Sequence, residues 1–128
     1  MMRESIGIFR GKDTIEHKWR YGNLTVHGDT AQIWEDTEIG IVNYLVDPET
    51  VGEFTGMTDA DGTRIFEGDI IRTYDPDDSP AAVKYDIGET MFAVVIDNIF
   101  CGLGEYFYAN DLTIIGNIHD NPELMGSI

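Results

Sequence analysis

Turn-forming clusters recur along the chain at intervals too short for long helices. Gly, Pro, Asp and Asn gather in segments such as HGDT, VDPET, DADG and DPDDSP, and the chain of 128 residues contains 14 glycines. The runs between these clusters are rich in β-branched and aromatic residues, which favour strands. No run has the sustained apolar spacing of an amphipathic helix. The pattern therefore predicts an all-β protein.

The runs between the turns are predicted strands, and one of them, TMFAVVI, is continuously apolar, as a strand covered on both faces would be. Single helical turns are expected where Asp47 and Asn121 each precede a proline, because Asp and Asn cap helices and Pro fits the first helical position. The predicted strands are Ser5–Arg10, Lys18–His27, Ala31–Glu35, Ile39–Val46, Val51–Thr55, Ile70–Tyr74, Ala82–Asp86, Thr90–Asp97, Glu105–Ala109 and Leu112–Ile118.

Acidic residues dominate the charge, with 24 Asp and Glu against 8 Lys and Arg and a net charge of −16. This excess argues against direct nucleic-acid binding, which depends on Lys and Arg, and against anionic membranes. Five basic residues fall within residues 1–20, whereas none follows Lys84. Two interpretations fit: a repulsive, well-solvated surface, or an acidic face for a basic partner or for the basic N-terminal stretch of a neighbouring subunit.

The single cysteine, Cys101, cannot form an internal disulfide and lies in the apolar run IFCG, where a buried small side chain is expected. No signal-peptide pattern is seen, and no apolar stretch approaches the length needed to span a membrane. These features predict a reducing, cytoplasmic location.

The acidic run DADG, Asp59–Gly62, resembles half of a calcium-binding loop. Placing Gly62 at the sixth position of an EF-hand loop puts Met57 at the first position and Gly68 at the twelfth, where the two strongest ligands belong. A calcium site is therefore not expected. Asp61 and Gly62 instead favour a type I′ hairpin turn, in which both central residues have positive φ.

The segment FEGDII, Phe66–Ile71, predicts a tight turn followed by a strand. Gly68 permits the bend, and the carboxylate of Asp69 can accept hydrogen bonds from amides of the turn. This pattern occurs in small SH3-like barrels.

Catalytic motifs are absent: the sequence has no G-x-S-x-G, H-E-x-x-H or C-x-x-C. The three histidines are scattered, and the carboxylate clusters lack accompanying His or Cys ligands, so solvated loops explain them best. We therefore predict no catalytic, cofactor-binding or metal-binding residues, and no enzymatic activity. The residues concerned are His17, His27, His119, Glu35, Asp36, Glu38, Asp75, Asp77 and Asp78.

Aromatic residues on strand-like segments are the best candidates for a protein interface, because Trp and Tyr are enriched at interface hot spots. In EYFY, strand alternation would place Tyr106 and Tyr108 on one face and Phe107 on the other. The candidate interface residues are Trp19, Tyr21, Trp34, Tyr106 and Tyr108.

Several segments, in the same order, resemble the YopX family of phage and prophage proteins. The resemblance touches both ends and the middle of the chain, and it is weak in His27–Leu45 and Ile87–Leu112. The matching segments are MRESIGIFRGK, KWRYGNL, VDPETVGEFTGMTDADGTRIFEGDII, VKYD and IIGNIHDNPELM.

The resemblance implies one YopX-like domain over residues 1–128, with a phage or prophage origin and a location in the bacterial cytoplasm. It implies an N-terminal β-hairpin region (1–49) followed by an SH3-like barrel with a short C-terminal turn (50–128). It supplies no activity and no site residues, and the matching residues look structural.

Two hypotheses of function follow. The first is a non-enzymatic β module that binds an unidentified phage or host protein, with homo-oligomerisation as a companion, because a basic N-terminus and an acidic remainder are complementary between subunits. The alternative is an acidic nucleic-acid mimic that occupies a host DNA-binding protein. A hydrolase built on the acidic clusters is the least favoured, since it requires a pocket with two carboxylates of shifted pKa.

Overall fold

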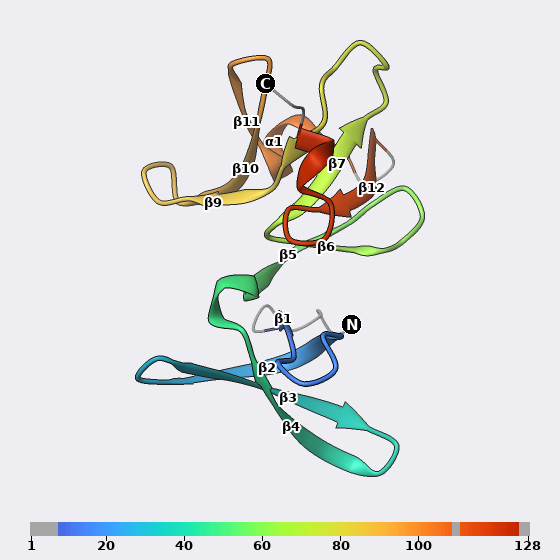
Figure 1. Ribbon diagram of the computed structural model, residues 1–128. Helices are drawn as coiled ribbons and strands as arrows, with labels where there is room; N and C mark the ends of the chain where they lie inside the picture. The colour runs from blue at the N-terminus through green and yellow to red at the C-terminus, as the bar shows by residue number, and fades with distance from the viewer. Residues whose placement is uncertain (1–7, 109–110, 126–128) are drawn as a thin grey trace, which may run out of the picture. The chain divides into compact units, whose positions relative to one another are not determined.

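Antiparallel strands dominate the chain, which confirms the expected all-β class (Figure 1). The computed structural model describes residues 8–108 and 111–125, except for the side chain of Tyr106. The chain divides into an N-terminal unit, residues 1–54, and a C-terminal unit, residues 55–128. The expected boundary, between residues 49 and 50, lies five residues before this division.

The elements follow one another closely along the sequence. In the N-terminal unit they are β1 (Phe9–Lys12), β2 (Trp19–His27), β3 (Thr30–Thr37), β4 (Gly40–Val46) and the 3₁₀ turn η1 (Pro48–Thr50). The strand β5 (Gly52–Thr58) begins in this unit and ends in the next. The C-terminal unit continues with β6 (Arg64–Phe66), β7 (Asp69–Thr73), β8 (Ala81–Ala82), β9 (Lys84–Asp86), β10 (Met91–Ile96), β11 (Ile99–Gly102), α1 (Leu103–Tyr106), β12 (Leu112–Asn117) and η3 (Pro122–Met125).

The N-terminal unit is a sheet in the order β4-β3-β2-β1-β5, in which tight turns join β2 to β3 and β3 to β4. Pairing of β3 with β4 runs without a register shift from Ala31 opposite Val46 to Thr37 opposite Gly40. Ala31, Ile33 and Val46 form the buried core. Because side chains alternate along a strand, the opposite face of β3 points away from this core.

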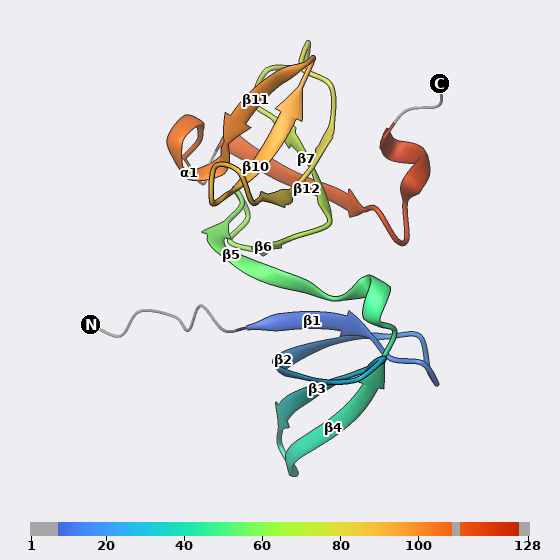
Figure 2. The ribbon, with the colours of Figure 1, turned by 90° about the vertical axis from the view of Figure 1, so that its left-hand side faces the viewer.

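The N-terminal sheet curls until the end of β4 meets the segment that follows β1 (Figure 2). The amide of Thr14 donates to the carbonyl of Leu45 at 3.0 Å, and the amide of Asp47 donates to the carbonyl of Lys12 at 2.9 Å. Gly22 allows the close packing inside the curl, since a Cβ there would lie 2.0 Å from the carbonyl oxygen of Trp34. Among the described residues, these bonds join only the end of β4 to the segment after β1.

The C-terminal unit contains two three-stranded antiparallel sheets, β11-β10-β9 and β12-β7-β8, together with the pairing of β5 with β6. Both sheets contribute to one apolar core, and α1 lies against β10 and β11. No closed barrel is formed by the described strands, so the SH3-like barrel is not confirmed. The core side chains are Ile65, Ile71, Ala81, Val83, Val94, Ile96, Cys101, Leu103 and Leu112.

The DADG run is a turn that is organised by a buried carboxylate. The side chain of Asp59 accepts hydrogen bonds from the amides of Asp61 at 2.9 Å and Thr63 at 3.0 Å, and from the amide of Ile114 in β12 at 3.1 Å. Gly62 has a φ of +82°, but Asp61 does not have positive φ. The predicted type I′ turn is therefore wrong, because these three amides hold the chain in a different turn.

The turn in FEGDII is confirmed. Gly68 has a φ of +95°, and the carboxylate of Asp69 accepts a hydrogen bond from the amide of Phe66 at 2.8 Å. Strand β7 begins at Asp69, and Ile70 and Ile71 within it are fully buried.

Most predicted strands are present, but Glu105–Ala109 is wrong. Its first residues belong to α1, where Leu103 turns into the core, and Ala109 lies outside the described residues. The expected alternation of Tyr106 and Tyr108 rested on this strand, and the side chain of Tyr106 lies outside the described part.

Three smaller differences concern the ends and faces of strands. Residues 5–7 of the predicted strand Ser5–Arg10 lie outside the described part, and β1 begins at Phe9. TMFAVVI is not covered on both faces, since Val95 is 58% exposed. Asp97 and Asn98, with φ of 49° and 70°, form a tight turn that adds the unpredicted strand β11.

Both expected helical turns are present as η1 and η3. The side chain of Asp47 accepts from the amide of Glu49 at 3.1 Å, as expected for a cap. Before η3, the backbone carbonyl of Asn121 accepts from the amide of Leu124 at 3.0 Å, and its side chain accepts from the amide of Asn117 at 3.2 Å.

We predict that Asp59→Ala lowers the free energy of unfolding by about 2 kcal/mol, because it leaves buried amides without an acceptor. The matched control is Asp61→Ala, an exposed aspartate of the same turn, which is expected to change stability by about 0.5 kcal/mol or less. Urea unfolding of both variants tests the difference. Equal losses would contradict the assigned role of Asp59.

Candidate protein-interaction surface

The predicted interface residues fall in two different units. Trp19 and Tyr21 lie on β2 and Trp34 lies on β3, all in the N-terminal unit. Tyr106 and Tyr108 belong to the C-terminal unit, where the side chain of Tyr106 lies outside the described part. Tyr108 is 80% exposed, and its amide donates to the carboxylate of Asp111 at 2.9 Å. The five candidates therefore do not form one described cluster.

The three candidates of the N-terminal unit share one face of the sheet. Alternation along β2 places Trp19, Tyr21 and Asn23 on the same side, and Asn23 pairs directly with Trp34. This side is opposite to the buried core around Ile33. We call it the outer face, and its members on β2, β3 and β4 are Trp19, Tyr21, Asn23, Thr25, Gln32, Trp34, Asp36, Ile41, Asn43 and Leu45.

Trp34 lies on the central strand of the β2-β3-β4 hairpins with its indole fixed across the sheet. Its Nε1 donates to the hydroxyl of Thr25 at 2.8 Å, and the side chain remains 38% exposed. Beside it, the side-chain Nδ2 of Asn43 donates to the side-chain Oε1 of Gln32 at 3.2 Å. A shallow hollow forms around this tryptophan, lined by Asn23, Thr25, Trp34, Asp36 and Ile41. A fixed, half-exposed indole of this kind is the typical centre of a protein contact.

Sequence reasoning missed the apolar side chains that β4 adds to this region. Ile41 is 71% exposed and Leu45 is also exposed on the outer face, while Ile39 is 90% exposed in the β3–β4 turn. The available signal was the run from Ile39 to Val46, which contains no charged residue in a chain that is 25% charged. Its alternation predicted a strand but did not tell which face would be left open.

Two basic residues of the N-terminal stretch, Arg10 and Lys12, lie against the ring of Trp19 on the same face. The guanidinium carbon of Arg10 lies 4.6 Å from the centre of the indole ring, and the ammonium nitrogen of Lys12 lies 5.7 Å from it. Such cation–π contacts stabilise cations near the ring face. The uneven charge seen in the sequence therefore places positive groups at one end of the outer face.

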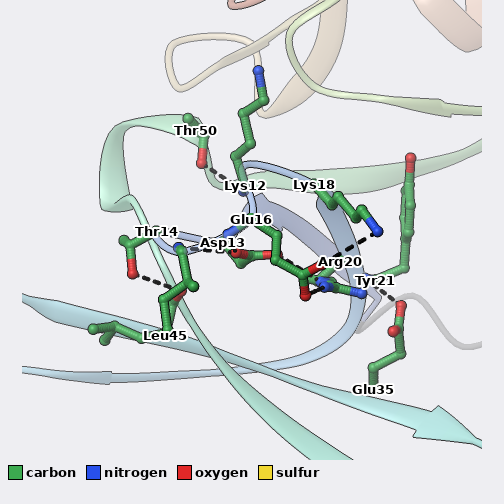
Figure 3. A network of polar contacts seen from close by, with 11 residues as sticks. Lys12, Asp13, Thr14, Glu16, Lys18, Arg20, Tyr21, Glu35, Leu45 and Thr50 are labelled. Carbon is green, nitrogen blue, oxygen red and sulfur yellow. Dashed lines mark hydrogen bonds and ion pairs between the residues drawn. The ribbon is translucent and has the colours of Figure 1, made fainter.

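A polar network fixes the turn between β1 and β2 (Figure 3). The guanidinium of Arg20 donates from Nε to the carboxylate of Asp13 at 2.8 Å, and from its Nη2 to Glu16 at 3.0 Å. The other oxygen of Asp13 accepts from the amides of Ile15 and Glu16. On its other side, Arg20 stacks over the ring of Tyr44 at 3.9 Å. Both partners of the ion pair are largely buried.

The surroundings of Asp13 set its charge. Burial opposes ionisation, but the hydrogen bonds from the Glu16 amide, Arg20 and the Ile15 amide outweigh it and lower the pKa of Asp13 from 3.8 to about 2. The pKa of Arg20 is raised, because the bond to Asp13 and nearby negative groups outweigh its burial. The pair is thus fully ionised at neutral pH, and every oxygen of Asp13 is engaged.

A second hollow lies in the C-terminal unit, where the sheet of β9, β10 and β11 meets η3. Its lining combines exposed apolar groups with one lysine, and comprises Ala82, Lys84, Tyr85, Asp86, Ala93, Val95, Phe100 and Met125. The ring of Tyr85 packs edge-on against Phe92, with centres 5.1 Å apart. None of the candidate aromatics whose side chains are described lines this hollow.

Possible metal ligands and the thiol of Cys101 were the other candidate sites in the described residues. Within residues 8–108 and 111–125, no group of three His, Cys, Asp or Glu side chains is arranged to hold a metal ion. Cys101 is buried as expected, and burial raises the pKa of its thiol, with a further contribution from Asp78. No described helix is long and apolar enough to cross a membrane.

Comparison with known proteins identifies a family and a similar solved structure. The YopX protein family matches residues 8–126. The crystal structure of protein EF1440 from Enterococcus faecalis is similar over 95% of this chain and 100% of that protein, with 25% sequence identity and a TM-score of 0.57. No curated protein matches the chain.

We predict that Asp13→Asn destabilises the protein by about 3 kcal/mol at neutral pH, because it removes the buried counter-charge of the Arg20 guanidinium and leaves only the exposed Glu16, among the described residues, to pair with it. The pKa of Asp13 is lower in the folded protein than its ordinary value of 3.8. Its contribution is therefore complete above 3.8 and lost as the pH falls towards 2.

The measurement is urea unfolding of the wild type and of Asp13→Asn at a series of pH values. The difference between the two proteins should shrink across this acidic window and stay constant above it. A difference independent of pH would contradict the assigned ionisation. Asp29→Asn, in the exposed β2–β3 turn, serves as the control with the same change of charge.

Proposed function

We propose that this chain, which belongs to the YopX family, is a non-enzymatic β module that binds proteins or assembles with itself. In this proposal its partner is a protein of the phage or of the bacterial host, and it works in the bacterial cytoplasm. In this proposal the C-terminal unit, with short antiparallel strands around one apolar core, is a variant of the SH3-like barrel in which the strands do not close.

The outer face of the N-terminal unit is the observation that carries this proposal. It holds Trp34 at its centre, with Tyr21, Ile41 and Leu45 exposed around it. Exposed aromatic and aliphatic groups on a rigid sheet bury apolar surface when a partner covers them, and a hydrogen-bonded indole loses little conformational freedom. The polar groups of Asn23, Thr25 and Asn43 supply hydrogen bonds that orient a partner.

The placement of the acidic groups favours this proposal over a nucleic-acid mimic. Asp13, Asp59 and Asp69 are buried and accept hydrogen bonds from the protein's own amides. Others lie in separate turns of both units, among them Asp29, Glu38, Asp47, Asp61, Asp77, Glu89 and Asp97. A mimic needs carboxylates repeated along one face at the spacing of phosphates.

We predict that Trp34→Ala abolishes partner binding, because truncation of a central tryptophan typically costs about 2 kcal/mol, roughly a 30-fold rise in Kd. The experiment uses the purified full chain as bait for extracts of the lysogenic or infected host, at low and physiological salt. Proteins retained by the wild type and lost with Trp34→Ala are the expected result.

Tyr108→Ala is the matched control, since it removes a more exposed aromatic from the other unit. Thermal unfolding of each bait verifies that the fold is kept. Retention of the same proteins by all three baits would remove the outer face from the proposal. A chain that retains nothing and stays monomeric at every salt concentration would contradict the proposal as a whole.

A further inference from the structure

Strand β4 is an open edge of the N-terminal sheet. It is the last strand in the order β4-β3-β2-β1-β5, and its pairing with β3 has no bulge. Its sequence, GIVNYLV, contains no proline and no charged residue. Edge strands of soluble proteins usually carry lysine, proline or a bulge that prevents pairing with another strand. None of these protections is present in β4.

Only the last part of this edge is occupied by the chain itself. Leu45 accepts the amide of Thr14, and Val46 forms a bridge with Asp13. Backbone groups alternate in direction along a strand, so those of Ile41 and Asn43 point the same way as those of Leu45, outward from the sheet. The free edge therefore runs from Gly40 to Tyr44, and no described residue pairs with it on its outer side.

The residues around the free edge are uncharged, whereas the rest of the chain is strongly acidic. The net charge is −16, yet no charge occurs between Glu38 and Asp47. Residues 1–54 carry five basic and ten acidic side chains, whereas residues 55–128 carry three basic and fourteen acidic ones. Two copies of this acidic chain repel each other least if they meet through β4, because β4 is uncharged and belongs to the less acidic unit.

We propose that a second copy of this chain pairs antiparallel with the free edge of β4, about a two-fold axis at Val42. This inference rests on the proposed function and names the partner of the same region. Ile41 pairs with the partner's Asn43, and the two residues exchange both backbone hydrogen bonds. The two copies of Val42 meet at the close, non-hydrogen-bonded position, where β-branched side chains pack well.

Two features select a second copy as the occupant. A two-fold axis makes the contact self-complementary, so one strand supplies both halves of the interface. Antiparallel pairing also brings the β3–β4 turn of one copy, with Glu38, towards the end of β4 in the other, beside the turn that carries Lys18. The ammonium of Lys18 lies 3.3 Å from the carboxylate of Glu16 and is 65% exposed, so across the contact Glu38 would share this cation with Glu16.

A second stretch of the sheet fits this contact less well. Among the described residues, β1 pairs with Trp19–Gly22 of β2, and no described strand pairs with Asn23–His27 on that side. Its outer-face side chains are polar, whereas those of β4 include Ile41 and Leu45. Apolar burial therefore favours β4.

The test is sedimentation velocity of the full chain at tens of micromolar and physiological salt. The wild type should sediment at close to twice the 14.4 kDa of one chain. Ile41→Lys puts a charge at the pairing edge, and Asn43→Pro removes an outward amide while keeping the bonds to β3. Each variant should raise the dimer Kd by about tenfold or more and sediment as a monomer.

Val95→Lys is the matched control, because it makes the same kind of substitution at an exposed position of the central strand β10. It should stay dimeric. Both lysine variants reduce the net negative charge, so general repulsion cannot explain a loss of the dimer. Circular dichroism and thermal unfolding of Asn43→Pro and Ile41→Lys establish that each monomer is folded.

The outcomes separate this inference from the proposed function. A wild type that is monomeric at every concentration overturns the pairing of β4, while binding of another protein through Trp34 is decided by the extract experiment. A dimer that survives both Ile41→Lys and Asn43→Pro also overturns the pairing and leaves self-assembly through another edge. A dimer lost in both variants and kept in Val95→Lys supports it.

Discussion

The ion pair between Asp13 and Arg20 determines the form of the N-terminal unit. The carboxylate of Asp13 gathers the amides that follow β1 and so shapes the turn into β2. The backbone of the same segment then pairs with the end of β4. A charge pair of this kind stabilises the fold only because its remaining hydrogen-bonding capacity is used, as it is here by Ile15 and Glu16. The curl of the sheet, its outer face and its open edge all depend on this arrangement.

The local chemistry of turns was the most predictable part of the fold. Gly68 with Asp69, and Asp47 before Pro48, form the turns that their sequences indicate, because each depends only on neighbouring residues. The turn at Asp59 was not predictable in detail, since one of its three hydrogen bonds comes from Ile114, 55 residues away. The helical turn α1 escaped prediction for a related reason: burial of Leu103 in the core outweighs the strand preference of the aromatic residues after it.

The sequence predicted which kinds of residue form the candidate surface, but not which residues lie together on one face. Sequence patterns identified Trp19, Tyr21 and Trp34 as aromatic residues on strands, and the pairing of Asn23 with Trp34 places all three on one face. Register of this kind is fixed by which side of the sheet covers the core, and that is a property of the whole unit. Ile41 became part of the surface for the same reason. Tyr106 and Tyr108 belong to the C-terminal unit.

Strand β5 has a consequence for how the protein unfolds. Its first residues pair with β1 in the N-terminal unit, and its continuation pairs with β6 in the C-terminal unit, without any linker between the two roles. Melting of either unit would leave half of a strand without its hydrogen-bonding neighbour. The free energies of the two units are therefore coupled through a single backbone segment, and one cooperative transition is expected where the geometry suggests two.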